Sequence, residues 1–183
     1  MSEKVFIISG SPRKGGNTDL MCEACAEGAR EAGKEVKIMY LRSIRLNPCL
    51  GCDYCHSQGH EEVCCQKDDW KEIFEGYDWA DAVIVGSPLY YYSISAQLKI
   101  LFDRSYVRAA KRMFYFKKAA FLSVSQNAKP DAHDTSYACF KGWMRCIGDV
   151  TEAGTVFAGG CKDKGDVEKT GKLEECRKLG REI

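Results

Sequence analysis

The chain has 183 residues, of which 45% are hydrophobic and 29% are charged; these proportions are typical of one globular domain, which we expect residues 1–183 to form. The 27 lysines and arginines nearly balance the 26 aspartates and glutamates, which argues against a general nucleic-acid-binding protein. The apolar run Val5–Ile8 is too short for a signal peptide, and no stretch approaches the roughly 18 apolar residues of a membrane span. We therefore expect a cytoplasmic protein with no membrane or nucleic-acid partner.

Apolar runs alternate with stretches of helical periodicity along the chain. The expected strands are residues 4–9, 35–41, 82–86, 118–125 and 151–158, and the expected helices are residues 17–33, 69–80, 94–113, 135–148 and 167–179. Asn17 or Thr18 can cap the first helix. This alternation predicts an α/β fold with a parallel sheet covered by helices on both faces.

Five strands in one domain favour a flavodoxin-like three-layer sandwich with strand order 2-1-3-4-5. Ligands of such sheets bind beyond the carboxyl ends of the strands, at the point where the strand order reverses. The loops 10–17, 87–93 and 125–134 would meet there. We therefore expect the binding site to be built from these three loops.

The loop after the first strand, Ser9-Gly-Ser-Pro-Arg-Lys-Gly-Gly-Asn-Thr18, has the chemistry of a phosphate cradle. Its glycines let the backbone approach a ligand, and the N-terminus of the next helix favours an anion. Its hydroxyl, amide and guanidinium groups can also bind phosphate. A nucleoside-triphosphate P-loop would need Lys-Ser/Thr after its second glycine, but Gly15 is followed by Gly16-Asn17. The spacing of Gly10, Gly15 and Gly16 excludes the dinucleotide fingerprint. The alternative is a glycine-rich turn whose polar side chains only cap the helix.

Eleven cysteines are the unusual feature of the composition. An odd count without a secretion signal favours a reducing compartment over a disulfide framework. Six are scattered and are expected in the core: Cys22, Cys25, Cys139, Cys146, Cys161 and Cys176. The other five lie in residues 49–65, the cysteine segment, within an expected irregular loop insertion over residues 42–67: Cys49, Cys52, Cys55, Cys64 and Cys65. Three thiols spaced Cys-x-x-Cys-x-x-Cys can bind one metal centre, with Cys64 or Cys65 as the fourth ligand.

Four motifs resemble the NAD(P)H-dependent FMN reductase family, flavodoxin-like proteins that include the iron–sulfur flavoproteins. These are the loop Gly10–Thr18, the stretch Gly86-Ser-Pro-Leu-Tyr-Tyr-Tyr-Ser93, the helical Lys99-Ile-Leu-Phe-Asp-Arg104, and the cysteine segment with Asp68-Asp69. The resemblance covers residues 4–105. Beyond them the chain agrees with the family only in the order of its elements.

The resemblance implies that FMN binds non-covalently. One set of residues would hold the FMN phosphate: Ser11, Arg13, Gly16, Asn17 and Thr18. A second set would border the isoalloxazine ring, although its tyrosines can equally be packing or interface residues: Pro88, Leu89, Tyr90 and Tyr91. Where the family has glycines near the ring, this chain has three other candidates: Ser125, Gln126 and Asn127. Asp103 and Arg104 would form a structural ion pair or a subunit contact.

The resemblance to the iron–sulfur flavoproteins also implies a [4Fe–4S] cluster on Cys49, Cys52, Cys55 and Cys64. Eight residues separate the last two of these cysteines, where the family has a shorter gap. Relatives without a cluster retain a similar loop, so other interpretations stay open. They are a loop of reduced thiols, a zinc site that could use His56 or His60, and a redox disulfide.

Seven cations and no acidic residue lie between residues 104 and 130: Arg104, Arg108, Lys111, Arg112, Lys117, Lys118 and Lys129. A solvated helix end or a subunit contact is the commonest meaning of such a stretch. A more specific hypothesis is that Arg108 and Arg112 attract the 2′-phosphate of NADPH.

Together these features predict an FMN-binding oxidoreductase that passes electrons from NAD(P)H to a small acceptor such as a quinone or free flavin. No general acid or base is expected, because the flavin carries the redox chemistry. The first alternative is an iron–sulfur flavoprotein that relays electrons between a [4Fe–4S] cluster and FMN, with a ferredoxin-type protein as partner. The second is a non-enzymatic zinc- or redox-sensing module. The resemblance further implies a homodimer or tetramer.

Overall fold

Parallel strands form the central sheet of the computed structural model, which describes residues 2–109 and 114–183. The strands are β1 (Lys4–Ser9), β2 (Glu35–Tyr40), β3 (Ala82–Pro88), β4 (Lys118–Val124) and β5 (Thr151–Ala158). They lie in the order β2-β1-β3-β4-β5, which confirms the expected flavodoxin-like topology. β1 and β3 are neighbours although β2 lies between them in the chain, so the strand order reverses at this pair.

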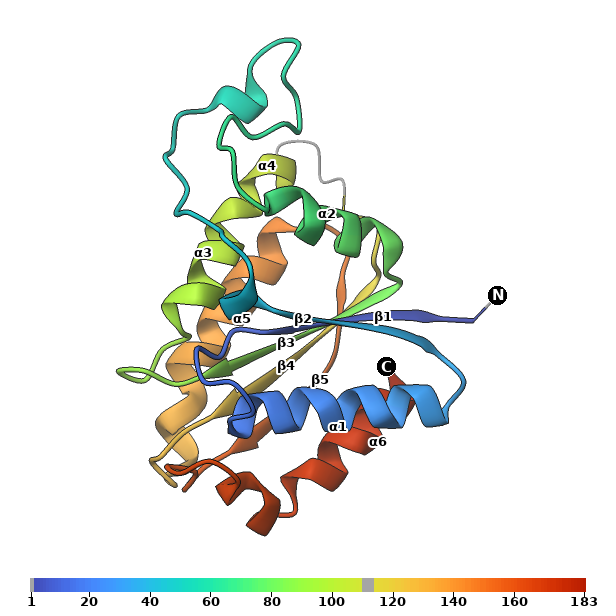
Figure 1. Ribbon diagram of the computed structural model, residues 1–183, viewed down its shortest axis with the longest axis vertical. Coiled ribbons are helices and arrows are strands. Elements are labelled where there is room, and N and C mark those ends of the chain that lie inside the picture. Colours follow the sequence, from blue (N-terminus) through green and yellow to red (C-terminus); the bar gives the residue numbers. More distant parts are fainter. Residues whose placement is uncertain (1, 110–113) are drawn as a thin grey trace.

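Helices cover both faces of the sheet (Figure 1). The helices are α1 (Asn17–Glu31), α2 (Trp70–Trp79), α3 (Ala96–Arg104), α4 (Tyr106–Ala109), α5 (Asp134–Cys146) and α6 (Lys172–Glu182). Residues alternate between the two faces along β1: Val5 and Ile7 pack in the core beneath α1 and α6, whereas Phe6 and Ile8 pack in the core beneath α2, α3 and α5. Burial on both faces explains why β1 is a continuous apolar run. Among the described residues, no helix is long and apolar enough to cross a membrane.

The two helices on the first face are in close contact because each carries a glycine at the crossing. A Cβ atom at Gly28 of α1 would collide with the backbone carbonyl of Arg177, and a Cβ atom at Gly180 of α6 would collide with that of Cys25. These glycines therefore let the two backbones touch. The contact fixes α1, and with it the loop that precedes α1, relative to the C-terminal part of the chain.

Two helix predictions were wrong in detail. The helix expected over 94–113 is divided at Ser105, which accepts a hydrogen bond from the Trp143 indole and donates one to the Leu101 carbonyl; residues 110–113 lie outside the described residues. The helix expected over 167–179 begins at Lys172 instead, because Gly171 has a φ of +73° and ends the preceding turn, a 3₁₀-helix over Asp166–Lys169.

The expected cap of the first helix was also wrong. Gly16 is the capping residue, and both Asn17 and Thr18 already belong to the helix. Among the described residues, no side chain hydrogen-bonds the first N–H groups of α1. This N-terminus therefore keeps N–H donors that a ligand can use.

Candidate functional site

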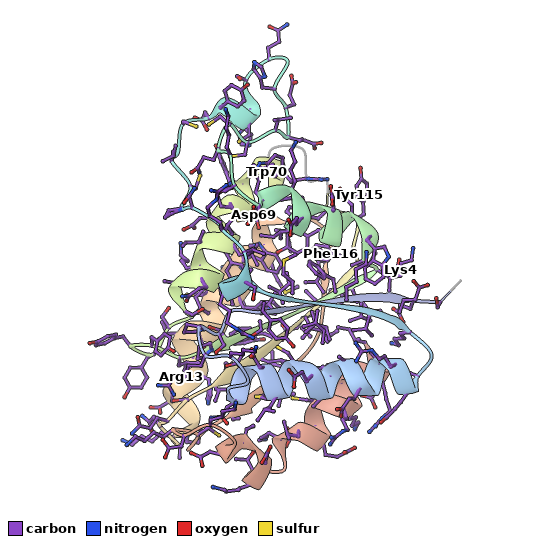
Figure 2. All side chains as sticks on the ribbon, in the orientation of Figure 1. Lys4, Arg13, Asp69, Trp70, Tyr115 and Phe116 are labelled. Carbon is purple, nitrogen blue, oxygen red and sulfur yellow. The ribbon has the colours of Figure 1, made fainter. Side chains whose placement is uncertain are left out.

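A cavity of about 220 Å³ lies at the carboxyl edge of the sheet, where the loops after β1, β3, β4 and β5 meet. Its lining residues are Ser11, Arg13, Gly16, Asn17, Thr18, Pro88, Leu89, Tyr90, Val124, Gln126, Cys161 and Lys162. The cavity thus brings together all five residues expected at the phosphate and three of the four expected at the ring. Arg13 extends from the loop that leads into α1 (Figure 2).

A buried carboxylate holds the loop between β1 and α1 in place. Asp19, in the first turn of α1, is fully buried and accepts hydrogen bonds from the Ser9 hydroxyl (2.6 Å) and the Gly15 backbone N–H (2.7 Å). Arg42 pairs with the same carboxylate at 2.9 Å and also donates to the Ser11 carbonyl. Because Gly15 has a φ of +62°, the loop needs a glycine there. The loop is therefore fixed by protein groups alone.

The N-terminus of α1 supplies donors to this cavity. Its first N–H groups have no side-chain cap, and a helix N-terminus carries about half a positive charge that favours an anion. The Thr18 hydroxyl has no hydrogen-bond partner in the described part of the chain, although Thr18 is 2% exposed. Ser11 offers a second hydroxyl, which also bonds to the backbone of Arg13. These groups fit the phosphate of FMN.

The side chain of Asn17 has a different role from the one expected. It donates to the Asp163 carbonyl at 2.8 Å and accepts from the N–H groups of Gly165 and Val167. It therefore holds the loop after β5 against the start of α1, and its backbone N–H is what it can offer to a ligand.

The loop after β5 brings cations to the phosphate end of the cavity, and our sequence analysis missed it. Lys162 lines the cavity, and its carbonyl accepts a hydrogen bond from Arg13. The amino group of Lys164 lies over Gly15. The signal was the pair Gly159-Gly160 followed by these lysines directly after the fifth strand, a position that we had not included in the site.

The stretch after β3 forms a tight turn beside the cavity. Pro88, Leu89 and Tyr90 line the cavity, whereas the Tyr91 side chain is fully exposed and does not. Tyr91 and Tyr92 both have positive φ values, +50° and +63°, which cost energy for residues with a side chain. The expected contact of Tyr91 with the ring stays a prediction that the lining of this cavity does not support.

The three candidates after β4 differ in what they offer. Gln126 is exposed and lines the cavity. The hydroxyl of Ser125 accepts a hydrogen bond from the Asn127 backbone, and Asn127 in turn donates to the Tyr92 hydroxyl and accepts from the Lys129 backbone. Ser125 and Asn127 therefore shape the loop.

All five thiols of the cysteine segment line a small cavity of about 20 Å³. The segment projects above α2 and α4, on the face of the sheet opposite α1 (Figure 1). Cys52 and Cys65 are the closest pair, with 3.7 Å between their sulfurs. A backbone hydrogen bond from Tyr54 lowers the pKa of the Cys52 thiol, the hydrogen bond to Cys52 raises that of Cys65, and burial raises that of Cys55.

The thiols do not form a preassembled metal site. Within the described residues, no three histidine, cysteine or acidic side chains are close enough together to hold a metal ion. The donor set nevertheless fits a thiolate-bound centre, because four or five thiols share one cavity and can converge when metal binds. His56 bonds to the Tyr106 carbonyl and His60 stacks on Tyr54, so both rings are already engaged with the protein.

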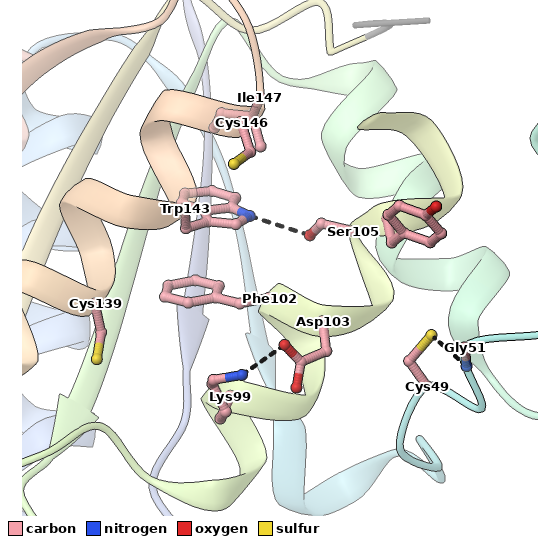
Figure 3. Close-up of a pocket in the computed structure, with 11 residues that line it drawn as sticks. Cys49, Gly51, Lys99, Phe102, Asp103, Ser105, Cys139, Trp143, Cys146 and Ile147 are labelled. Atoms are coloured by element: carbon pink, nitrogen blue, oxygen red, sulfur yellow. Dashed lines mark hydrogen bonds and ion pairs between the residues drawn. The ribbon is translucent and has the colours of Figure 1, made fainter. Parts of the chain in front are cut away.

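An apolar groove of about 560 Å³ lies beside the cysteine segment, between α3, α4 and α5 (Figure 3). Phe102 and Trp143 stack at its base with their ring centroids 4.6 Å apart. Cys139 and Cys146 line it, half-buried and exposed respectively, so the expectation that the scattered cysteines lie in the core was wrong for these two. The expectation is confirmed for the other four scattered cysteines, which are buried: Cys22, Cys25, Cys161 and Cys176.

The basic stretch is largely neutralised in the described residues. Arg104 pairs with Asp68, Arg108 with Asp78, and Lys118 with Glu3. Asp103 pairs with Lys99, so the expected ion pair between neighbours 103 and 104 does not form. Lys111 and Arg112 lie outside the described residues. The pairing of Arg108 weakens the hypothesis that it is reserved for NADPH.

Comparison with known proteins places the chain in a family. A family model described as NADPH-dependent FMN reductase matches residues 3–137. An iron–sulfur flavoprotein of Methanosarcina thermophila is 34% identical over 158 residues, which are 86% of this chain and 81% of that protein. One of Methanocaldococcus jannaschii is 44% identical over 102 residues, or 56% of this chain and 51% of that protein. The chain spans about half the length of this relative and of a second from the same organism.

A solved structure agrees in fold over nearly the whole chain. The NAD(P)H:quinone oxidoreductase of Methanothermobacter marburgensis superimposes with a TM-score of 0.79 at 22% identity, covering 99% of this chain and 96% of that one. At this level of identity the likeness concerns the fold. The sequence matches carry the classification: the chain belongs to the NADPH-dependent FMN reductase family, together with the iron–sulfur flavoproteins.

Proposed function

We propose that the chain is an FMN-binding oxidoreductase of the NAD(P)H-dependent FMN/quinone reductase type, acting in the cytoplasm. The observation that carries this proposal is the uncapped N-terminus of α1, which opens with Thr18 and Ser11 into the cavity at the carboxyl edge of the sheet. Free N–H groups, hydroxyls and nearby cations together form a site for a phosphate group.

Each part of the cavity has a distinct task toward FMN. The N–H groups of α1 and the hydroxyls of Ser11 and Thr18 would bind the phosphate, while Arg13 and Lys162 balance its charge. Pro88, Leu89 and Tyr90 would pack against the ring. When bound, FMN supplies the redox chemistry, accepting electrons from NAD(P)H and passing them to a small acceptor such as a quinone or flavin. The protein orients the ring and excludes water.

FMN titration of an Arg13→Ala variant tests this assignment. We expect about tenfold weaker FMN binding, equivalent to about 1.4 kcal/mol, measured by the quenching of flavin fluorescence. Arg30→Ala is the matched control, because Arg30 is exposed in the last turn of the same helix, far from its N-terminus. Equal FMN affinity in the wild type and Arg13→Ala would contradict the phosphate site.

A second candidate function is favoured by the cysteine cavity together with the sequence relatives. Five thiols line one cavity, and we propose that four of them, Cys49, Cys52, Cys55 and Cys64, hold a [4Fe–4S] cluster that exchanges electrons with FMN, with a ferredoxin-type protein as partner. The cysteine cavity and the cavity beside the loop between β1 and α1 are separate sites in one chain, since they share no lining residue among the described residues. The proposed homodimer or tetramer would then bring a cysteine segment to a neighbouring subunit's FMN.

The two candidates predict different donors. If the chain is a reductase, NADPH bleaches the flavin absorbance of a Cys55→Ala variant as fast as that of the wild type. If it is a relay, Cys55→Ala removes reduction of the flavin by a reduced ferredoxin while FMN affinity stays unchanged. Rapid mixing of each donor with both proteins under anaerobic conditions distinguishes them.

A further inference from the structure

Arg104, the last residue of α3, is a buried cation that joins the two ends of the cysteine segment. It is 1% exposed, and its guanidinium pairs with Asp68 through two hydrogen bonds of 2.6 and 3.0 Å. It also donates to the Asn47 carbonyl at 2.8 Å. Asp68 in turn accepts from the backbone N–H groups of Asn47 and Trp70. The ion pair therefore fixes the chain just before Cys49 and just after Cys65.

The same guanidinium makes a direct contact with one thiol of the segment. Nη2 of Arg104 lies 3.3 Å from Sγ of Cys64. Arg104 is also part of the wall of the cysteine cavity, and its Nε is buried with no hydrogen-bond partner among the described residues. A buried cation with a spare donor in a cavity lined by thiols suits a centre that carries negative charge on sulfur.

The neighbouring cysteine is held differently. Cys65 is exposed and its sulfur contacts Cys52, whereas Cys64 is half-buried against Arg104. Both thiols line the cavity, so either could complete a metal site with the first three cysteines. Eight residues separate Cys55 from Cys64, and a gap of that length does not fix which thiol reaches the metal. The guanidinium of Arg104, at the end of α3, contacts Cys64 and so distinguishes the two thiols.

We propose that Arg104 is the positioning residue of the cysteine site, which selects Cys64 over Cys65 as the fourth sulfur ligand. The inference rests on the second candidate function, in which this segment binds a metal centre. The bidentate pair with Asp68 keeps the guanidinium in one orientation, so its N–H group meets the sulfur at a fixed place. Arg104 touches a ligand and not the metal, and so acts through Cys64.

Binding of Co²⁺ alone to the reduced, metal-free protein tests this role, because sulfur-to-cobalt absorption reports how many thiolates bind. We expect Cys64→Ala to weaken Co²⁺ binding at least tenfold and Cys65→Ala to leave it unchanged. Arg104→Lys, which keeps a positive charge for Asp68, should weaken binding about tenfold, as loss of an outer hydrogen bond does at other metal sites. In that background Cys65→Ala should weaken Co²⁺ binding further, because without the Arg104 guanidinium Cys65 serves as the fourth ligand in a share of the molecules.

Two controls separate positioning from a general structural effect. Arg108→Lys makes the same change in a nearby ion pair, with Asp78, away from the thiols, and should not alter the effect of Cys65→Ala. Thermal unfolding checks that each variant folds. If Cys65→Ala changed Co²⁺ affinity equally in the wild-type and Arg104→Lys backgrounds, the positioning role of Arg104 would be overturned, while the metal site itself would stand. A wild type that binds no Co²⁺ would overturn the site itself, and its iron and sulfide content tests the cluster separately.

Discussion

The phosphate loop and the cysteine segment are both irregular stretches that follow a strand or lead into a helix, yet they are held in different ways. In the loop between β1 and α1, the buried carboxylate of Asp19 accepts hydrogen bonds from Ser9 and Gly15 and pairs with Arg42. The cysteine segment is instead held at its two ends, where the ion pair of Asp68 and Arg104 bonds to the backbone of Asn47. The first site is organised by protein groups alone, whereas the thiols of the second would be brought together only by the metal centre that we propose.

The largest expected effect comes from removing the carboxylate that organises the phosphate loop. Asp19→Ala leaves Arg42 without its partner and frees the Gly15 N–H, so we expect a loss of about 3 kcal/mol in the free energy of unfolding and at least tenfold weaker FMN binding. Urea unfolding and flavin fluorescence measure the two effects.

The control for this change is Asp103→Ala. Its ion pair with Lys99 is exposed, with both side chains about half accessible, so its loss should cost less than about 1 kcal/mol. Equal losses for both variants would mean that the phosphate loop is not organised by its buried carboxylate.

The next largest effect should come from metal removal, which we expect to change hydrogen exchange in the cysteine segment but not in the loop between β1 and α1. After treatment with a strong chelator, we expect amide hydrogens of residues 50–63 to exchange at least tenfold faster, because the thiols lose the centre that joins them. Amides of residues 10–18 should keep their rates, since protein groups hold that loop. Hydrogen exchange read by mass spectrometry follows both stretches in one sample. Unchanged exchange in residues 50–63 would show that the segment is as organised without metal as with it.

A smaller effect concerns the loop after β4. Burial lowers the pKa of His133, which is hydrogen-bonded to Ser123 at 2.7 Å and stacked on Phe157. The unfolded chain takes up a proton near pH 6.5 where the folded chain resists it, so this group's contribution to stability is lost as the pH falls from about 7 towards the lowered folded pKa. The wild type should lose up to about 1 kcal/mol more than His133→Gln between pH 7 and pH 5.

Urea unfolding at both pH values measures the difference. The other two histidines in the chain, His56 and His60, are unchanged in the variant and therefore cancel. The same pH slope in both proteins would contradict the buried, neutral state of His133.

The smallest expected effect lies in the tyrosine turn beside the phosphate loop. Tyr91 has a φ of +50° and a fully exposed side chain, so Tyr91→Gly relieves strain and loses no packing. We expect a gain of about 0.5 kcal/mol, which is the strain relieved less the larger chain entropy of glycine. Tyr115→Gly, at an exposed tyrosine with an ordinary φ, should instead lose stability. A loss in both variants would show that the turn is not strained.

The sequence predicted what is local and missed what is long-range. The strands were predictable because apolar runs alternate with stretches of helical periodicity. The hydrogen-bonding groups of the loop between β1 and α1 were predictable because ten neighbouring residues contain them. The contacts of Asp19 with Arg42, and of Arg104 with both Asp68 and Cys64, join residues more than 20 positions apart. No periodicity marks such pairs. The hydrogen bond from the Trp143 indole to the hydroxyl of Ser105, where the helix divides, is likewise a contact between distant residues.

The position of the half-buried Cys139 and the exposed Cys146 at a groove was unpredictable on similar grounds. Helical periodicity identifies an apolar face of α5 but not how far other elements cover it, and these two residues line a groove that the described residues leave open. Likewise, Asn17 lines the cavity at the carboxyl edge of the sheet, yet its side chain is engaged by a loop about 150 residues further along the chain.

The most direct test of the account is the visible spectrum of anaerobically purified protein, measured together with its flavin, iron, sulfide and zinc content. We expect bound FMN, with iron and sulfide in addition if the cysteine segment is loaded. Flavin without iron would leave the phosphate site intact and remove the cluster. Zinc with no flavin, persisting after incubation with FMN, would contradict the central claim that the loop between β1 and α1 binds FMN.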